Sequence, residues 1–269
     1  MFKWIRGLSI APLVGALLIG VFGLAAGAAA PALARPKPTI VLVHGAFAES
    51  GSWNLVVSGL VRDGYHVVAV ANPLRSASGD AAYVAAALAQ IDGPVVLVGH
   101  SYGGTVITGA ALGRPNVKAL VYVSAFEPDA GETSFGLSAR FPGSTLGAAL
   151  APPVKLPDGN LDLYIRQDRF HAQFCADLPA ALALDLAATQ RPITQAAGEE
   201  PSGQPAWKTI PSWSIYGSAD LNIPPAAMAF MSARAHARRT VEVKGASHLV
   251  MLSHPREVVA VIEEAATRY

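Results

Sequence analysis

The sequence predicts an α/β fold, in which a mostly parallel, doubly wound sheet is covered by helices on both faces. Short, continuous apolar runs rich in β-branched residues alternate along the chain with segments of helical spacing. Because these runs lack an alternating polar face, they are typical of buried parallel strands. With 269 residues, of which 52% are hydrophobic and 14% charged, the chain can build one large domain with a substantial core.

Four of the predicted strands lie in the first half of the chain, and helices follow three of them. The strands are expected at residues 39–43, 65–70, 95–98 and 117–124, and the helices at residues 50–63, 80–91 and 102–112. Apolar side chains at helical spacing, such as Trp53 and Leu60, indicate the first helix, and Gly64 ends it. A turn at 92–94 and Gly113 end the other two helices.

The alternation lapses over residues 130–206, which carry Pro152-Pro153, a Pro-Asp-Gly turn at 157–159 and short helical patches. A stretch of this length is too long for a plain loop in a compact domain. It is predicted to be a helical cap over the carboxyl edge of the sheet. The alternation then resumes, with strands at residues 212–216 and 240–243, a helix opened by Pro224-Pro225 and a last helix at residues 255–266.

Residues 1–34 have the pattern of a secretory signal peptide. Lys3 and Arg6 give a basic start, residues 7–34 carry no charge, and Ala32-Leu33-Ala34 is a small-x-small cleavage pattern. Cleavage is expected after Ala34, which leaves residues 35–269 as an exported domain, either periplasmic or secreted. Residues 8–30 are long enough to span a bilayer, so an uncleaved membrane anchor is the alternative, although their Gly and Ala content weakens a stable span.

Charge and cysteine content narrow the classes of function. Removal of residues 1–34 takes away Lys3 and Arg6 but no acid, so the formal charge falls from +1 to −1. The chain has no basic field or dense charge run that would bind nucleic acid. Cys175 is the only cysteine, so we expect a buried thiol, with pairing between chains as the alternative. The Cys and His spacing fits no metal site, and no cofactor is expected.

Residues 95–104, Val-Val-Leu-Val-Gly-His-Ser-Tyr-Gly-Gly, contain the strongest motif of the chain. An apolar strand leads into Gly-x-Ser-x-Gly, and helix-forming residues follow, which is the context of a nucleophile elbow. Ser101 would lie on a sharp, strained turn at the end of the sheet. Gly99 and Gly103, which lack a Cβ, would relieve crowding on both sides. Ser101 is therefore the predicted nucleophile.

A serine hydroxyl is a weak nucleophile and needs a histidine base that an acid holds in the right tautomer. Asp220 and His248 each come just past the end of a predicted strand. The order Ser, Asp, His along the chain is the order that accompanies the elbow motif. Asp220 is the predicted acid and His248 the predicted base. Glu127 and Asp129, which also follow a strand, are rival acids.

The other histidines are assigned away from proton transfer. His254 directly precedes a proline and is expected at the surface or at a helix cap, while His171 lies in the cap and His236 near a helix end. His44 and His100 flank the predicted site. They are expected to hydrogen-bond the backbone of loops that must keep their shape.

A tetrahedral intermediate needs backbone N–H donors for its developing negative charge. One donor is expected from Tyr102, the residue after the nucleophile. The other should come from the loop after the first strand, with Ala46 first and Phe47 second, because Gly45 lets that loop bend. These residues form the predicted oxyanion hole.

The motifs resemble those of the α/β-hydrolase superfamily. The resemblance covers roughly residues 39–268 and is carried by Val-His-Gly-Ala-Phe at 43–47, Gly-His-Ser-Tyr-Gly at 99–103, Gly-Ser-Ala-Asp at 217–220 and Gly-Ala-Ser-His-Leu-Val-Met-Leu at 245–252. The last string, with the Ser-Trp pair at 52–53, resembles the branch of plant methyl esterases and hydroxynitrile lyases, together with related bacterial esterases. The resemblance implies a serine esterase with the α/β-hydrolase fold.

Departures from the family sort the alternatives. Dehalogenases and epoxide hydrolases of this fold attack with a carboxylate, whereas position 101 is Ser. Hydroxynitrile lyases of this branch carry a threonine and a lysine where this chain has Gly45 and Leu249, so a departing cyanide would lack its counter-charge. The resemblance therefore favours hydrolysis over lyase chemistry.

The sequence thus predicts an exported serine carboxylesterase that hydrolyses small, hydrophobic esters through an acyl-enzyme on Ser101. Apolar cap residues suggest the hydrophobic substrate, although a cap needs such residues to cover a sheet: Leu146, Leu150, Leu156, Leu161, Leu163, Phe170 and Phe174. A cofactor-free haloperoxidase or perhydrolase, or an acyltransferase, would use the same three catalytic residues. A non-catalytic binding protein of this fold is the alternative from another class, and the oligomeric state is left open.

Overall fold

The structure, a computed structural model, describes residues 36–269, so the predicted signal peptide at residues 1–34 lies outside the described residues. The strands are β1 (Thr39–Val43), β2 (Val67–Val70), β3 (Val95–His100), β4 (Val117–Val123), β5 (Val154–Lys155), β6 (Leu161–Leu163), β7 (Ile193–Thr194), β8 (Ser212–Gly217) and β9 (Arg239–Val243). The α-helices are α1 (Asn54–Arg62), α2 (Ala77–Leu88), α3 (Tyr102–Ala110), α4 (Ser134–Ala139), α5 (Leu146–Ala149), α6 (Gln167–Phe174), α7 (Ala180–Thr189), α8 (Gln195–Glu199), α9 (Pro225–Arg234), α10 (Val250–Ser253) and α11 (Pro255–Arg268), and the 3-10 helices are η1 (Ser50–Trp53) and η2 (Ala206–Lys208).

The main sheet has the strand order β2-β1-β3-β4-β8-β9, and every neighbouring pair is parallel. β3 and β8 are buried at every position; the apolar run Val95–Val98 predicts this for β3, whereas β8 also buries Ser212 and Ser214. Since β2 lies on one side of β1 and β3 on the other, the direction of winding reverses at β1. Open α/β sheets bind their ligands at the carboxyl ends of the strands beside such a reversal. The fold therefore directs attention to the loops that follow β1 and β3.

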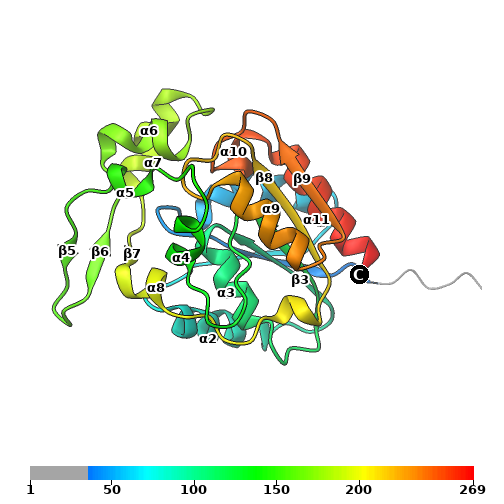
Figure 1. Ribbon diagram of the computed structural model, residues 1–269. Coiled ribbons are helices and arrows are strands. Elements are labelled where there is room, and N and C mark those ends of the chain that lie inside the picture. The colour runs from blue at the N-terminus through cyan, green and yellow to red at the C-terminus, as the bar shows by residue number, and fades with distance from the viewer. Residues whose placement is uncertain (1–35) are drawn as a thin grey trace, which may run out of the picture. The chain divides into compact units, whose positions relative to one another are not determined.

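Helices cover both faces of this sheet (Figure 1). α1 and α11 pack against each other on one face, while α2, α3 and α9 lie on the other. This arrangement confirms the predicted α/β fold with a doubly wound sheet. In the part of the chain that the structure describes, no helix has both the length and the apolar character needed to cross a membrane.

The segment at residues 130–206 contains α4 to α8 and, in addition, a small antiparallel sheet of order β5-β6-β7. Figure 1 shows this small sheet together with α5, α6 and α7 to one side of the main sheet. The sequence predicted helices alone here. Its strands are only two or three residues long, too short to leave a periodic signal; β5 and β6 form a local hairpin, whereas β7 joins β6 from a distant segment.

Helix starts account for most of the remaining differences from the sequence expectations. The helix expected at 50–63 opens as the 3-10 helix η1 before α1. α2 starts at Ala77 rather than Asp80, because the Ser76 hydroxyl caps it by accepting the N–H of Gly79 at 3.0 Å. Asp80 thus lies in the first turn of α2.

Candidate active site

Ser101 lies between β3 and α3, at the carboxyl edge of the sheet. Its φ of 54° and ψ of −126° form a conformation that residues other than glycine rarely adopt. Three backbone hydrogen bonds hold this turn: the Ser101 N–H donates to Val123 O at 3.2 Å, and the Ser101 carbonyl accepts from Gly104 at 2.9 Å and from Phe126 at 3.2 Å. Such strain persists only where the surroundings fix it, and here it lifts the Ser101 side chain off the end of the sheet.

The glycines around Ser101 stand where other segments pass too close for a side chain. A Cβ on Gly99 would lie 2.6 Å from Gly103 O, and a Cβ on Gly103 would lie 2.5 Å from Val43 O at the end of β1. A Cβ on Gly45 would lie 2.6 Å from the Cβ of Ser101. The loop after β1 and the turn after β3 therefore touch directly, because glycines line their contact.

Asp220 and His248 form a buried pair at the ends of β8 and β9. The Nδ1 of His248 lies 2.6 Å from Asp220 Oδ2, and the two residues are 1% and 2% exposed, respectively. The other carboxylate oxygen, Oδ1, accepts the backbone N–H groups of Asn222 at 2.8 Å and Ile223 at 3.0 Å. A carboxylate at Nδ1 keeps the proton there and leaves Nε2 as an acceptor. The structure thus brings the predicted acid and base into contact.

Ser101 and His248 line the same cavity, together with Ala46 and Tyr102. Within residues 36–269, His248 Nε2 has no hydrogen-bond partner, so the bond from the Ser101 hydroxyl is not made in this structure. Catalytic hydrogen bonds are often long or misaligned in enzymes without substrate. The structure therefore places the predicted nucleophile and base on one cavity but does not join them.

The two donors considered for the second oxyanion position differ in their hydrogen bonds. The Phe47 N–H already donates to Arg191 O at 2.8 Å, which favours Ala46 over Phe47 as the second donor. The Phe47 ring instead lines the cavity. Ala46 lines the same cavity, and its N–H donates to no other group of residues 36–269. Tyr102 is the first residue of α3, where N–H groups have no partner inside the helix.

His44 and His100 hydrogen-bond the backbone, as their sequence context suggested. The Asn72 N–H donates to His44 Nε2 at 3.0 Å, which puts the His44 proton on Nδ1, 3.0 Å from Gly45 O. His100 Nε2 lies 3.2 Å from the carbonyl of His248. Burial lowers the pKa of His44 to about 4 and also lowers the pKa of His100, so both rings are neutral at pH 7.

The remaining histidines also have other partners. His171 Nε2 contacts Leu178 O at 2.8 Å, and His254 Nδ1 contacts Ser253 Oγ at 2.9 Å. His254 is the N-cap residue of α11, which agrees with the cap position expected for it. His236 follows the end of α9.

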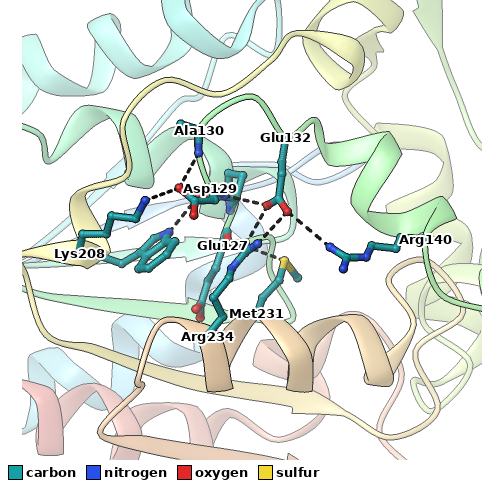
Figure 2. Close-up of polar contacts among 10 residues, drawn as sticks. Glu127, Asp129, Ala130, Glu132, Arg140, Lys208, Met231 and Arg234 are labelled. Atoms are coloured by element: carbon teal, nitrogen blue, oxygen red, sulfur yellow. Dashed lines mark hydrogen bonds and ion pairs between the residues drawn. The ribbon is translucent and has the colours of Figure 1, made fainter.

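The rival acids lie in a separate polar cluster, shown in Figure 2. Asp129 Oδ1 accepts from Lys208 Nζ at 2.6 Å and from the Ala130 N–H at 2.7 Å. Arg234 donates to both carboxylate oxygens of Glu132, at 2.7 and 2.8 Å, and to the backbone carbonyl of Glu127 at 2.8 Å. Asp129 therefore joins this cluster through its carboxylate and Glu127 through its backbone carbonyl, while His248 contacts Asp220.

Glu127 is the most unusual group of this cluster. It is 1% exposed, and neither carboxyl oxygen has a hydrogen-bond partner within residues 36–269. Burial raises the pKa of Glu127 from 4.5 to about 8, although the charge of Arg234 works in the opposite direction. The native protein thus holds Glu127 as a neutral acid at pH 7.

Glu127→Gln should change how stability depends on pH. Below pH 4.5 the Glu127 carboxyl is protonated in both the native and the unfolded chain; between pH 4.5 and about 8 only the native chain keeps the proton, so native stability falls as pH rises. The free energy of unfolding of Glu127→Gln relative to the unmodified protein should therefore rise by about 1 kcal/mol per pH unit in this window. Urea unfolding at pH 5, 6, 7 and 8 measures this slope, and a difference that stays constant with pH would contradict it.

The cavity beside Ser101 has a volume of about 330 Å³ and is mainly apolar. Of the apolar residues predicted for the cap, Leu146, Leu150, Leu163 and Phe174 line it. Leu156, Leu161 and Phe170 do not; Phe170 is buried in the core. Four of the seven apolar cap residues therefore border the cavity, and the hydrophobic substrate that they suggested stays a prediction.

Few polar side chains line the cavity. Besides Ser101 and His248, these are three serines and one amide, Ser134, Ser138, Ser144 and Asn222. None of the lining residues is Asp, Glu, Lys or Arg. A charged ligand buried here would lose its hydration without gaining a partner ion, at a cost of several kcal/mol. The cavity therefore fits a neutral ligand.

Comparison with known proteins agrees with this fold. Residues 40–261 match the sequence profile of the alpha/beta hydrolase family. The chain belongs to this family. It is 28% identical over 250 residues to the alpha/beta hydrolase nvfD of Aspergillus novofumigatus (strain IBT 16806), which covers 86% of this chain and 97% of the relative.

Two further matches carry names of esterases. A carbendazim hydrolyzing esterase of Nocardioides sp. (strain SG-4G) is 31% identical over 135 residues, which are 41% of this chain and 54% of the relative. The crystal structure of polyneuridine aldehyde esterase superposes with a TM-score of 0.74 at 20% identity, covering 85% of this chain and 99% of that structure. The predicted α/β-hydrolase fold is confirmed, and these names agree with a hydrolase that acts on ester bonds.

Sequence reasoning about this hydrolase missed three residues near the site. Asn222 joins the acid loop to the cap, since its side chain contacts Gln173 Nε2 at 3.2 Å and Gln173 O at 3.1 Å. Phe135 lines the cavity, and the backbone carbonyl of Arg191 accepts the N–H of Phe47. For Asn222 the sequence signal concerns the backbone alone: Asp220 accepts the N–H two residues on, as in an Asx turn, and this does not predict the side-chain bonds to Gln173. For the other two, only the fold brings the partners together.

Proposed function

We propose that the protein is a serine carboxylesterase that hydrolyses small, neutral, hydrophobic esters through an acyl-enzyme on Ser101. One observation carries the proposal: the buried Asp220–His248 pair, with its 2.6 Å contact, borders the same apolar cavity as a serine on a strained elbow. Export, with cleavage after Ala34, stays a prediction from the sequence.

Acylation begins when His248 Nε2 takes the proton of the Ser101 hydroxyl as Oγ attacks the acyl carbon. Asp220 stabilises the imidazolium that forms, and its own bonds to two backbone N–H groups hold it in place. The N–H groups of Tyr102 and Ala46 donate to the oxyanion. The imidazolium then protonates the leaving alkoxide, and the bond from the acyl carbon to the alcohol oxygen breaks.

Deacylation follows the same route with water in place of the alcohol. His248 takes a proton from water, whose oxygen attacks the acyl carbon, and the proton passes to Ser101 Oγ as the carboxylic acid departs. His100 supports both steps, because it holds the carbonyl of His248 while its neutral ring adds no charge beside the imidazolium. No group beyond these side chains and amides is needed.

Hydrolysis is favoured over cyanohydrin cleavage by the charges around the cavity. Leu249, which stands where hydroxynitrile lyases of the resembling branch carry a lysine, is 1% exposed, and no Lys or Arg lines the cavity. A departing cyanide anion would have no counter-charge. An alkoxide needs none, since the imidazolium protonates it as it leaves.

Two esters of equal length test the proposed substrate class. We expect p-nitrophenyl butyrate to be hydrolysed with a kcat/KM at least about 10-fold above that of p-nitrophenyl hemisuccinate, because the succinyl carboxylate must be buried without a partner ion. Release of p-nitrophenol at pH 7.5 measures both values. Equal rates would contradict the substrate class. Failure to hydrolyse any p-nitrophenyl ester from acetate to octanoate would contradict the esterase assignment itself.

A further inference from the structure

The ring of Phe135, which lines the cavity, rests end-on against a glycine of the neighbouring helix. A Cβ built on Gly198 in α8 would lie 2.2 Å from Phe135 Cζ, 2.4 Å from Cε2 and 2.6 Å from Cε1. The φ of Gly198 lies outside the left-handed region, so its backbone does not require glycine. The space taken by the Phe135 ring is what excludes a larger residue at position 198.

α8 is anchored at Thr194, the residue directly before the helix, to the segment between β2 and α2. The Thr194 N–H donates to Leu74 O at 3.1 Å, and the Thr194 hydroxyl donates to Arg75 O at 2.7 Å. Arg75 Nη2 donates in turn to Pro192 O at 2.8 Å. Several hydrogen bonds would have to break before this helix could move away from the ring.

α4, which carries Phe135, is anchored in the same way on the other side of the ring. The hydroxyl of Ser134 bonds that of Thr105 in α3 at 2.8 Å, and the Ser138 hydroxyl donates to Asn222 O at 2.9 Å. α3 begins at the residue after Ser101, so the bond between Ser134 and α3 fixes the position of Phe135 relative to the nucleophile. Between two anchored helices, the Phe135 side-chain torsions are the part that can yield.

We propose that Phe135 is the specificity-determining residue of the cavity, with Gly198 as its seat, and that this pair sets the longest apolar chain of a neutral ester that the cavity accepts. This inference rests on the proposed esterase function. A methyl group at position 198 forces the ring tip to withdraw by more than about 1 Å to reach normal carbon–carbon contact. Since both helices are held, the ring turns into the cavity and shortens it. Removal of the ring lengthens the cavity instead.

Substitution of either partner should shift the chain-length profile in opposite directions. We expect Phe135→Ala to raise the ratio of kcat/KM for p-nitrophenyl decanoate over acetate by about 10-fold, the value of one to two buried methylene groups. Gly198→Ala should lower that ratio by a similar factor and keep acetate within about twofold. Gly203→Ala is the matched control, since a Cβ there meets nothing within 4 Å, and its profile should stay unchanged.

The double variant Phe135→Ala/Gly198→Ala separates this wall from general damage to the fold. Without the ring, the methyl group at 198 has nothing to displace, so the decanoate to acetate ratio should return to the level of Phe135→Ala or close to it. If the two single effects simply add, the ring does not transmit the effect of position 198 and the proposal is wrong.

Two measurements that need no catalysis test the role of Phe135 separately from the esterase assignment. The crystal structure of Gly198→Ala should show the Phe135 ring moved toward Ser101 with α8 in place, and n-alkyl methyl ketones should raise the melting temperature only up to a shorter chain than in the unmodified protein. If these results hold while no ester is hydrolysed, only the esterase assignment fails. The proposal would be wrong if the Phe135 ring turned to solvent, or if α8 moved while the longest ketone that raises the melting temperature stayed the same.

Discussion

Ser101→Ala is expected to lower kcat for p-nitrophenyl butyrate by about 10³- to 10⁶-fold. In the proposed mechanism the variant lacks the atom that attacks the acyl carbon, and what remains is the rate that the oxyanion donors and substrate binding supply by themselves. The substitution keeps the Cβ at the strained φ of 54°, so the turn should be retained and the melting temperature should change little. Steady-state rates and a thermal melt of the same preparation measure both expectations.

Ser124→Ala is a closely matched control for this loss. Ser124 follows β4 as Ser101 follows β3, is buried, has a positive φ of 43°, and its hydroxyl has no hydrogen-bond partner within residues 36–269. The cavity beside Ser101 is not lined by it. We expect Ser124→Ala to keep kcat within about threefold. A Ser101→Ala variant that keeps a tenth of the activity would rule out the nucleophile assignment.

Asp220→Asn is expected to lower kcat by about 10⁴-fold with little change of the fold. An asparagine amide would donate to Nδ1 of His248 and so move the ring proton to Nε2, where it blocks the transfer from Ser101. The substitution also removes the negative charge that stabilises the imidazolium. The pH profile of kcat/KM, measured beside kcat, distinguishes this change of tautomer from a general loss of folded protein.

Glu127→Gln is the comparison that decides between the two acids. Glu127 follows the strand end where an alternative acid was considered, but its carboxyl is neutral at pH 7 and has no hydrogen-bond partner within residues 36–269. The amide has the same shape, so kcat should stay within about threefold at pH 7. If Glu127→Gln loses activity and Asp220→Asn keeps it, the acid belongs after β4 and the present assignment is wrong.

The sheet could be predicted from the sequence because local patterns determine it. The apolar run at 39–43 is β1 to the residue, and the other main strands begin and end within two residues of expectation. The central strands β1, β3, β4 and β8 are almost wholly buried, so in them burial and β-branching give one clear signal, whereas the edge strands β2 and β9 are partly exposed. The predicted start of α2, Asp80, lies after the observed start at Ala77, because the Ser76 hydroxyl caps the helix and so begins it earlier.

The cap was harder to predict, because long-range contacts shape it. The strand at 193–194 pairs with the distant strand at 161–163, and even the local hairpin of 154–155 with 161–163 is too short for a periodic signal. The contact between Phe135 and Gly198 also joins segments far apart in the sequence. A glycine in a helical patch gives no hint of which ring it accommodates.

In the candidate site, too, local motifs could be predicted from the sequence, whereas long-range contacts could not. Motifs at strand ends predicted Ser101, Asp220 and His248 as the catalytic residues, and the topology brings these strand ends to one edge of the sheet. The choice between Ala46 and Phe47 depended on Arg191, whose carbonyl takes the Phe47 amide. No rule that reads neighbouring residues finds a partner so distant along the chain.

The central claim is that Ser101, activated by His248, is the group that attacks the substrate. A fluorophosphonate bonds covalently only to a serine made nucleophilic by such a base, and mass spectrometry of the digested protein locates the adduct. The account predicts one phosphonyl group per chain, on Ser101, with labelling slowed at least about 100-fold in His248→Ala. An adduct on another residue, or an unlabelled protein that still hydrolyses esters, would contradict it.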